Sequence, residues 1–317
     1  MLDIIIPAYN AHKTLPLTLS SIATQTYVDK IKVTVVNDCG DNYNEIVNYY
    51  KQFMDIQETT TDKNGGVGVA RQKGIDITRH KFFMCLDADD TLMDNLSIEK
   101  MLNKIESQHV VLSGGFLEEL ENRKFKRHLN DFVWMHAKVY RRSFIDKHKI
   151  RFNETRANED MGFNMYVRLL AQERQICYYN DFFVLWRFNH KSHTRKDNNA
   201  YKYHEGALGV MENKQQVLEA MGIEKDRHRL EAVSAFIDFH FMVQETDVFR
   251  PEQQDWVSDL FNRTKKFYHD IAKHAIAKTN TDDIKYLYRE RFNMFDFMPT
   301  TTLFEFIDMM EEKDESI

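Results

Sequence analysis

Aspartates follow directly after an apolar run in the stretch FMCLDADDTL, residues 83–92. Asp87 and Asp89 alternate with Ala88, so at the end of a strand both carboxylates can approach one divalent cation, which prefers oxygen ligands. A cation with few protein ligands completes its coordination shell with substrate phosphates. An acidic turn without a ligand is the alternative, because acid-rich turns are common at strand ends.

A second chemistry fits the same residues. LDADDTL resembles the first motif of haloacid dehalogenase-type phosphatases, D-x-D-x-T, in which Asp87 would attack a phosphoryl group. That motif normally lies on the first strand of its domain. Three strand signals precede it here, which counts against the phosphatase interpretation.

The composition limits the class of protein. The chain has 317 residues, 43% of them hydrophobic, and a formal net charge of -6. This composition indicates a folded protein without the strongly basic surface of most nucleic-acid-binding proteins. Cys39, Cys85 and Cys177 form no C-x-x-C pair. No apolar run reaches the roughly 18 residues of a transmembrane helix, and the N-terminus lacks the basic leader of a signal peptide. We expect a cytoplasmic protein and leave peripheral membrane attachment open.

Short apolar runs alternate with helical patterns up to about residue 115, which is typical of βαβ units. The predicted strands are 2–6, 31–38, 55–61, 81–86 and 109–114, and the predicted helices are 13–25, 44–54, 65–78 and 95–107. This order predicts an α/β fold with a Rossmann-like, mostly parallel central sheet. Ligands bind at the carboxyl ends of such strands, and Asp38 and Asp87 both lie there.

The rest of the chain divides into two further parts. Residues 116–199 are less regular, with a charged excursion at 118–131 and a helical pattern at 158–172. Residues 200–317 are helical throughout. We therefore predict a catalytic domain at 1–199 and a helical C-terminal domain at 200–317.

Four stretches resemble, in order and spacing, the nucleotide-sugar-binding half of family-2 glycosyltransferases of the GT-A fold: IIIPAYN, VTVVNDCGD, KNGGVGVARQKG and FMCLDADDTL. The segment from YRRSFI to YVRLL and the stretch LWRFNHKSHT are similar to the acceptor-side segments of that family. The resemblance covers about 195 residues. It implies a nucleotide-sugar-binding half at 1–115, an acceptor-side half at 116–199, and an inverting, metal-dependent transfer of a sugar from a nucleotide diphosphate to an acceptor hydroxyl.

The resemblance also implies donor-binding residues. One wall of the base pocket would be formed by Pro7, Ala8 and Tyr9, and Asp38 would accept the imide hydrogen of uracil, which points to a UDP-sugar. Asn37 and Cys39-Gly40 depart from the commoner D-D-G-S, so the base is left open. The full implied donor-binding set is Pro7, Ala8, Tyr9, Asn10, Asp38, Asn64, Gly65, Arg71, Asp87, Ala88 and Asp89, with Arg71 near the diphosphate.

The catalytic base is implied by NEDMGF. Asp160 would take the proton of the acceptor hydroxyl and Glu159 would orient it. Helix capping is the structural alternative, since acidic residues favour helix N-termini.

Mn²⁺ or Mg²⁺ would be coordinated by Asp89, with Asp87 at the ribose or a metal-bound water. His190, favoured over His193, would be a further metal ligand, and Asp90 would cap the turn.

The sequence does not decide the identity of the acceptor or of any partner protein. Most relatives build surface polysaccharides or glycolipids, which is the default, and a modified DNA base of a virus is an alternative. A further alternative is a non-catalytic nucleotide-sugar sensor. The helical region would shape the acceptor side or form a homo-oligomer contact.

Overall fold

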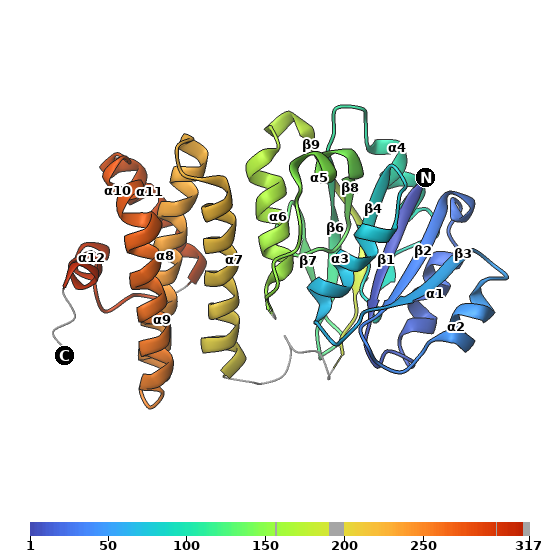
Figure 1. The fold of residues 1–317 in the computed structure, drawn as a ribbon, viewed down its shortest axis with the longest axis horizontal. Coiled ribbons are helices and arrows are strands. Elements are labelled where there is room, and N and C mark those ends of the chain that lie inside the picture. Colours follow the sequence, from blue (N-terminus) through green and yellow to red (C-terminus); the bar gives the residue numbers. More distant parts are fainter. Residues whose placement is uncertain (156, 190–199, 296, 313–317) are drawn as a thin grey trace. The chain divides into compact units, whose positions relative to one another are not determined.

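The computed structural model describes residues 1–155, 157–189, 200–295 and 297–312. The chain divides into two compact units, Met1–Ser192 and His193–Ile317. Each unit is described by itself below (Figure 1). Among the described residues, no helix is both long enough and apolar enough to span a membrane.

The first unit is built on a single mixed sheet in the order β3-β2-β1-β4-β8-β6-β9-β5, with β7 paired to β6. Its strands are β1 (Leu2–Ala8), β2 (Ile31–Asn37), β3 (Asp55–Thr60), β4 (Phe82–Cys85), β5 (Thr91–Leu92), β6 (Val111–Glu119), β7 (Phe125–His128), β8 (Lys138–Arg141) and β9 (Ile176–Trp186). The strands β3, β2, β1 and β4 are parallel. Beyond β4 the directions are mixed, because β8 is antiparallel to both β4 and β6 while β6 and β9 are parallel.

Helices cover both faces of this sheet, which explains why β1 is apolar on both sides. The helices are α1 (Leu15–Ala23), α2 (Asn44–Tyr50), α3 (Val67–Ile77), α4 (Ser97–Lys104), α5 (Arg142–His148) and α6 (Glu159–Leu170), with 3₁₀ turns at Val28–Lys30 and Glu173–Gln175. Ile4 and Ile6 belong to the core that α1, α2 and α4 close. Ile5 belongs to the core that α3, α5 and α6 close.

A close contact sets the position of α3 against the sheet. Gly74 lies so near β1 that a Cβ atom on it would be 2.3 Å from Cγ2 of Ile5. Real Cβ contacts are never this short, so any larger residue would push α3 away from β1.

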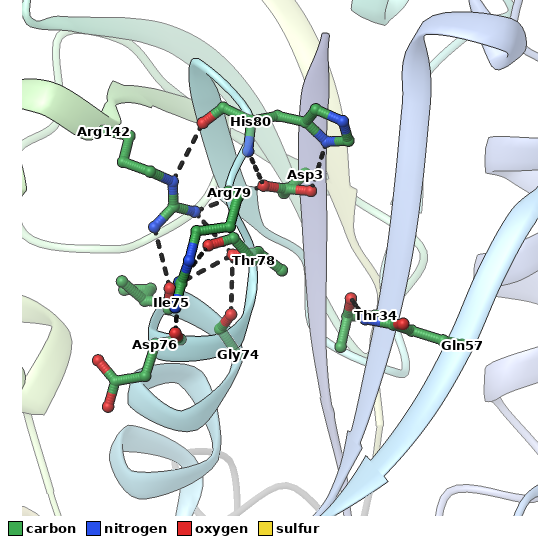
Figure 2. Close-up of polar contacts among 10 residues, drawn as sticks. All are labelled: Asp3, Thr34, Gln57, Gly74, Ile75, Asp76, Thr78, Arg79, His80 and Arg142. Atoms are coloured by element: carbon green, nitrogen blue, oxygen red, sulfur yellow. Dashed lines mark hydrogen bonds and ion pairs between the residues drawn. The ribbon is translucent and has the colours of Figure 1, made fainter.

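A buried ion network joins several elements at the amino end of β1 (Figure 2). Asp3 is fully buried and accepts hydrogen bonds from the backbone N–H of His80 at 2.8 Å and from Arg142 Nη2 at 3.4 Å. Its other oxygen lies 2.7 Å from Nδ1 of His80. Arg142 also donates to the carbonyl of Ile75 at 2.9 Å and to Thr78 Oγ1 at 2.6 Å. The network therefore connects β1, the end of α3 and the start of α5 at the edge away from the strand carboxyl ends.

The structure confirms the predicted order of elements up to residue 115, since β1, β2, β3, β4 and β6 and the helices α1 to α4 fall on the predicted segments. The charged excursion at 118–131 is the β6–β7 hairpin. The sequence analysis missed β9, which is the longest strand described.

The second unit is helical, as predicted. It contains α7 (Gly206–Met221), α8 (Asp226–Phe249), α9 (Gln254–Phe267), α10 (Lys273–Ala277), α11 (Thr281–Phe295) and α12 (Leu303–Glu311), with π-helical segments at Tyr201–Glu205 and Tyr268–Ala272. The long helix α8 buries Phe236 and Phe239. The ring centroid of Phe236 lies 5.3 Å from that of Tyr268, and the ring centroid of Phe239 lies 4.8 Å from that of Phe267. A capping box between Thr302 and Glu305 begins α12.

Candidate active site

The ends of β1 and β2 place several predicted donor-binding residues together. Pro7 and Ala8 are the last residues of β1 and are buried, whereas Tyr9 is 55% exposed. Asn10 adopts a left-handed backbone conformation, with φ of 52°. A Cβ on Gly40 would lie 3.2 Å from the Tyr9 ring, so the turn after β2 packs against Tyr9.

Asp38 holds the segment that leads into α3. Its carboxylate accepts hydrogen bonds from the backbone N–H groups of Gly65 at 3.0 Å and Gly66 at 2.8 Å. Thr61 Oγ1 donates to it at 2.9 Å. The structure thus brings Asp38 and Gly65 together, while Asn64 is exposed beside them. The contact of Asp38 with a base stays a prediction.

Arg71 joins the two halves of the predicted site. Its side chain is 4% exposed, and its guanidinium donates to Asp87 and to Glu159, each at 2.7 Å. Glu159 approaches closely because Gly68 leaves room for it, since a Cβ there would lie 2.8 Å from the Glu159 side chain. Within the described part of the chain, Nε of Arg71 has no hydrogen-bond partner. Arg71 is therefore an ion-pair partner of the proposed donor and base residues, and its contact with a diphosphate stays a prediction.

The carboxylates around Arg71 are not fully neutralised. Burial, together with the charge of Asp160, raises the pKa of Glu159 to about 7. Burial also raises the pKa of Asp160 and of Asp89. Desolvation opposes the ionisation of Asp87, but the charges of Arg71 and His136 and the hydrogen bond from Arg71 together outweigh it and lower the pKa of Asp87. When ionised, the carboxylates of Asp87, Glu159 and Asp160 outnumber the single guanidinium of Arg71 between them, and this favours binding of an added cation.

Asp89 and Asp90 contact the chain beyond β9. Asp89 accepts a hydrogen bond from Asn189 Nδ2 at 2.8 Å. Asp90, which is 1% exposed, accepts one from the backbone N–H of Arg187 at 3.0 Å and lies 2.9 Å from His136 Nε2. The prediction that Asp90 caps its own turn is wrong, because both oxygens bind residues from β9 and the β8 side. Burial raises the pKa of Asp90 to about 6.

Asp160 lies in the first turn of α6 and is 8% exposed. Its carboxylate accepts a hydrogen bond from the N–H of Met161 at 2.8 Å, so it interacts with the helix N-terminus as the structural alternative requires. Asn158, the N-cap residue, adopts a left-handed conformation. The helix start fixes Asp160 beside Glu159 and thus beside Arg71, which is a suitable position for a base.

The described residues fit a divalent cation. Ligand atoms of Asp87, Asp90 and His136 lie within 4.8 Å of one another. Asp90 and His136 already bind each other, however, whereas Asp87 and Asp89 are only partly buried. Asp87 and Asp89 are thus the more accessible oxygen ligands. His190 and His193 lie outside the described residues.

Sequence reasoning missed His136. It lies 46 positions from Asp90, in the stretch FVWMHAKVY, which carries no motif for a site. The sequence predicts the stretch FVWMHAKVYRRSFI as a strand that runs into a helix, and a histidine inside such a strand is not a site signal. Its ring stacks on Phe116 at 4.8 Å. Burial opposes its protonation, but the hydrogen bond that it donates to Asp90 and the charges of Asp90 and Asp87 raise its pKa.

Comparison with known proteins identifies the family. The model for glycosyl transferase family 2 matches residues 3–163, just over half of the chain, and the match includes Asp38, Asp87 and Asp160. The chain belongs to glycosyl transferase family 2. This assignment removes the basis for the phosphatase interpretation of Asp87, which is ion-paired with Arg71.

Family 2 relatives match most of the chain at low identity. A poly(ribitol-phosphate) beta-glucosyltransferase of Bacillus spizizenii is 22% identical over 295 residues, covering 86% of this chain and 46% of the relative. This chain thus spans about half the length of the curated relatives it matches.

Solved structures show the same fold. Residues 1–349 of S. aureus TarS, solved in complex with UDP-GlcNAc, match with a TM-score of 0.65 at 16% identity, covering 92% of both chains. A mannosyltransferase from Pyrobaculum calidifontis, solved with GDP-Man and Mn²⁺, matches with a TM-score of 0.54 at 11% identity, covering 93% of this chain and 84% of that one. The family 2 chain described here therefore has the GT-A fold.

Proposed function

We propose that this family 2 chain is an inverting glycosyltransferase that moves a sugar from a UDP-sugar to an acceptor hydroxyl with the help of Mn²⁺ or Mg²⁺. The observation that carries the proposal is the Arg71 cluster. One buried guanidinium holds Asp87, on the donor side, and Glu159, beside the proposed base, at 2.7 Å each.

Asp160 is the proposed general base. As the acceptor oxygen forms its bond to the anomeric carbon, its proton moves to the Asp160 carboxylate, and the bond from that carbon to the diphosphate oxygen breaks. Attack from the face opposite the leaving group inverts the anomeric centre. Glu159 and Arg71 keep Asp160 in place and set its electrostatic environment. The raised pKa of Asp160 makes its carboxylate a stronger base than an exposed aspartate.

Asp89 and Asp87 are the proposed residues that hold the divalent cation. When bound, such an ion supplies positive charge to the diphosphate leaving group. The unbalanced carboxylates of the cluster support this assignment. The Mn²⁺ complex of the Pyrobaculum mannosyltransferase gives it further support.

Tyr9, Asn10 and the turn after β2 form the proposed nucleoside pocket. An exposed aromatic side chain beside a buried carboxylate suits a base that stacks and hydrogen-bonds. UDP is the preferred nucleotide, since TarS was solved with UDP-GlcNAc. A polymeric surface glycan or polyol phosphate is the proposed acceptor, given the names of the relatives.

A donor panel tests the proposal. Purified protein with Mn²⁺ is incubated with UDP-glucose, UDP-GlcNAc and GDP-mannose, each with and without poly(ribitol phosphate) or oligosaccharide acceptors, and release of nucleoside diphosphate is measured. We expect turnover with a UDP-sugar, loss of it with EDTA, and an NMR coupling constant showing the inverted anomer. Folded protein that neither hydrolyses nor transfers from any donor would contradict the proposal.

A further inference from the structure

An aromatic group lies next to the acidic turn. The rings of Trp134 and Trp186 are 5.1 Å apart, and the His136 ring is 5.0 Å from Trp186 and 6.5 Å from Trp134. His136 and Phe116 are buried, whereas both tryptophans are only partly buried. Large aromatic side chains that keep an accessible surface are common where a protein contacts a ligand with both apolar and polar groups.

The backbone of Trp134 is fixed by three polar side chains. Its N–H donates to Asp131 Oδ1 at 2.9 Å, and its carbonyl accepts from Lys138 Nζ at 2.5 Å and from Asn164 Nδ2 at 3.1 Å. Lys138 is fully buried, and burial lowers its pKa to about 8. Burying a lysine and an asparagine costs free energy. Here both side chains hydrogen-bond the carbonyl of Trp134, whose indole stays accessible. These bonds fix the backbone that carries the indole, so a ligand that packs on Trp134 has little loop to order.

Trp134 lies between the two chemical groups of the proposed site. On one side, His136 binds Asp90, the residue after Asp89. On the other side, Asn164 is four residues after Asp160 and so projects from the same face of α6. The segment that carries Trp134 therefore lies near the start of α6, and His136 is close enough to Asp160 for its charge to act on that carboxylate.

We propose that Trp134, supported by Trp186 and His136, is the stacking surface for a pyranose ring of the acceptor. This inference rests on the proposed function. A pyranose presents an apolar face of C–H groups and polar edges, so an indole binds the face while nearby carboxylates and amides bind the hydroxyl groups. We assign the occupant as the acceptor and not the donor sugar, because Asn164, which holds the Trp134 backbone, lies one helical turn from Asp160, and Asp160 must meet the acceptor hydroxyl.

Tryptophan fluorescence gives a direct test. The chain has three tryptophans, Trp134, Trp186 and Trp256, and the third lies on α9, where it stacks on His204 at 5.5 Å. In the Trp256→Phe variant, emission reports only on the aromatic group. With UDP and Mn²⁺ present, we expect methyl β-glucoside, methyl N-acetyl-β-glucosaminide or a glucan trisaccharide to shift or quench the emission. Ribitol, an acyclic polyol without a ring face, should change it much less.

Kinetics provide the second readout. Trp134→Ala should raise the KM for a cyclic acceptor about tenfold, with the KM for the UDP-sugar unchanged, and Trp134→Phe should recover most of the loss because it keeps a ring. An emission change that needs the donor sugar and is absent with UDP would assign the surface to the donor and overturn the inference. So would unchanged emission with every saccharide, or an unchanged acceptor KM in Trp134→Ala. Donor turnover in the same protein shows that such a failure belongs to the acceptor surface and leaves the proposed function intact.

Discussion

Replacing Arg71 with Met removes the only cation that contacts both Asp87 and Glu159 among the described residues. Methionine is unbranched and replaces the aliphatic part of the arginine side chain without its charge. The change therefore tests the charge of Arg71 more than its packing.

The expected cost follows from burial. Removing one partner of a buried ion pair typically costs about 3–5 kcal/mol, because the other charge is left without compensation. The Glu159 side chain is 7% exposed, so the full cost of an uncompensated charge applies to it. The Asp87 side chain is 31% exposed, and water replaces part of its lost contact. We therefore expect a loss of about 3 kcal/mol in the free energy of unfolding at pH 8.

The loss should depend on pH. The pKa of Glu159 is raised in the folded state to about 7, so the folded state binds more protons than the unfolded state between about pH 4.5 and pH 7, and stability falls as the pH rises through that window. Without Arg71 the pKa of Glu159 rises further, so the pH range over which stability falls extends to higher pH. At pH 5.5 Glu159 is largely protonated in both folded proteins. Because its pKa is about 7 in the wild type, the difference between them should shrink by about 1.4 kcal/mol from its value at pH 8, to roughly 1.6 kcal/mol.

Urea unfolding measures this difference. In a Trp256→Phe background, the emission of Trp134 and Trp186 follows the first unit, and midpoints with a common slope give the free energies. Arg151→Met is the matched control: Arg151 makes two hydrogen bonds to Asp76, at 3.0 and 2.8 Å, but its side chain is 59% exposed. An exposed pair contributes less than about 1 kcal/mol. Equal losses for the two variants at pH 8, or a loss for Arg71→Met that ignores pH, would refute the reasoning.

Four further predictions concern the site and the fold. Asp160→Asn should lower kcat by about 10²–10⁴-fold and spare donor affinity measured by calorimetry, and equal kcat would rule Asp160 out as base. In the wild type, burial raises the pKa of Asp160, so the acid-side fall of kcat should lie at a higher pH than the titration of an exposed aspartate; an acid limb at or below the ordinary aspartate range would contradict this. Asp89→Asn should raise the Mn²⁺ concentration needed for donor binding by tenfold or more, with EDTA-treated wild type as reference. Arg142→Met should cost about 3–5 kcal/mol in stability, because Asp3 is fully buried, and leave the KM values of the folded protein unchanged.

The sequence predicted the first half of the fold well for a physical reason. The strands β1, β2 and β4 are buried on both faces and flanked by helices, so each appears as a short apolar run between helical patterns. The strand β9 was missed because polar residues, Asn180 and Asp181, interrupt its aromatic run at a register shift opposite Gly114 and Gly115. Local pattern does not reveal which strands become neighbours. The stretch with β8 reads as a strand from the sequence, but its antiparallel place between β4 and β6 had no signal.

The same limit applies to the site. The clustering of Asp38 and Gly65 follows from the rule that ligands bind at strand carboxyl ends. The pairing of Arg71 with Glu159 joins residues 88 positions apart, and the pairing of Asp90 with His136 joins residues 46 apart. Neither spacing has a sequence signature, since both depend on how α6 and β8 pack against the sheet.

The glycine at position 74 has an effect beyond its own contact with Ile5. Gly74 and Arg71 are three residues apart on α3 and so face the sheet together. How deeply the guanidinium reaches beneath the strand ends is set by how near the helix axis comes to β1. A single methyl group added at Gly74, far from any substrate, would tilt or lift this helix and carry the positive charge away from both carboxylates it serves.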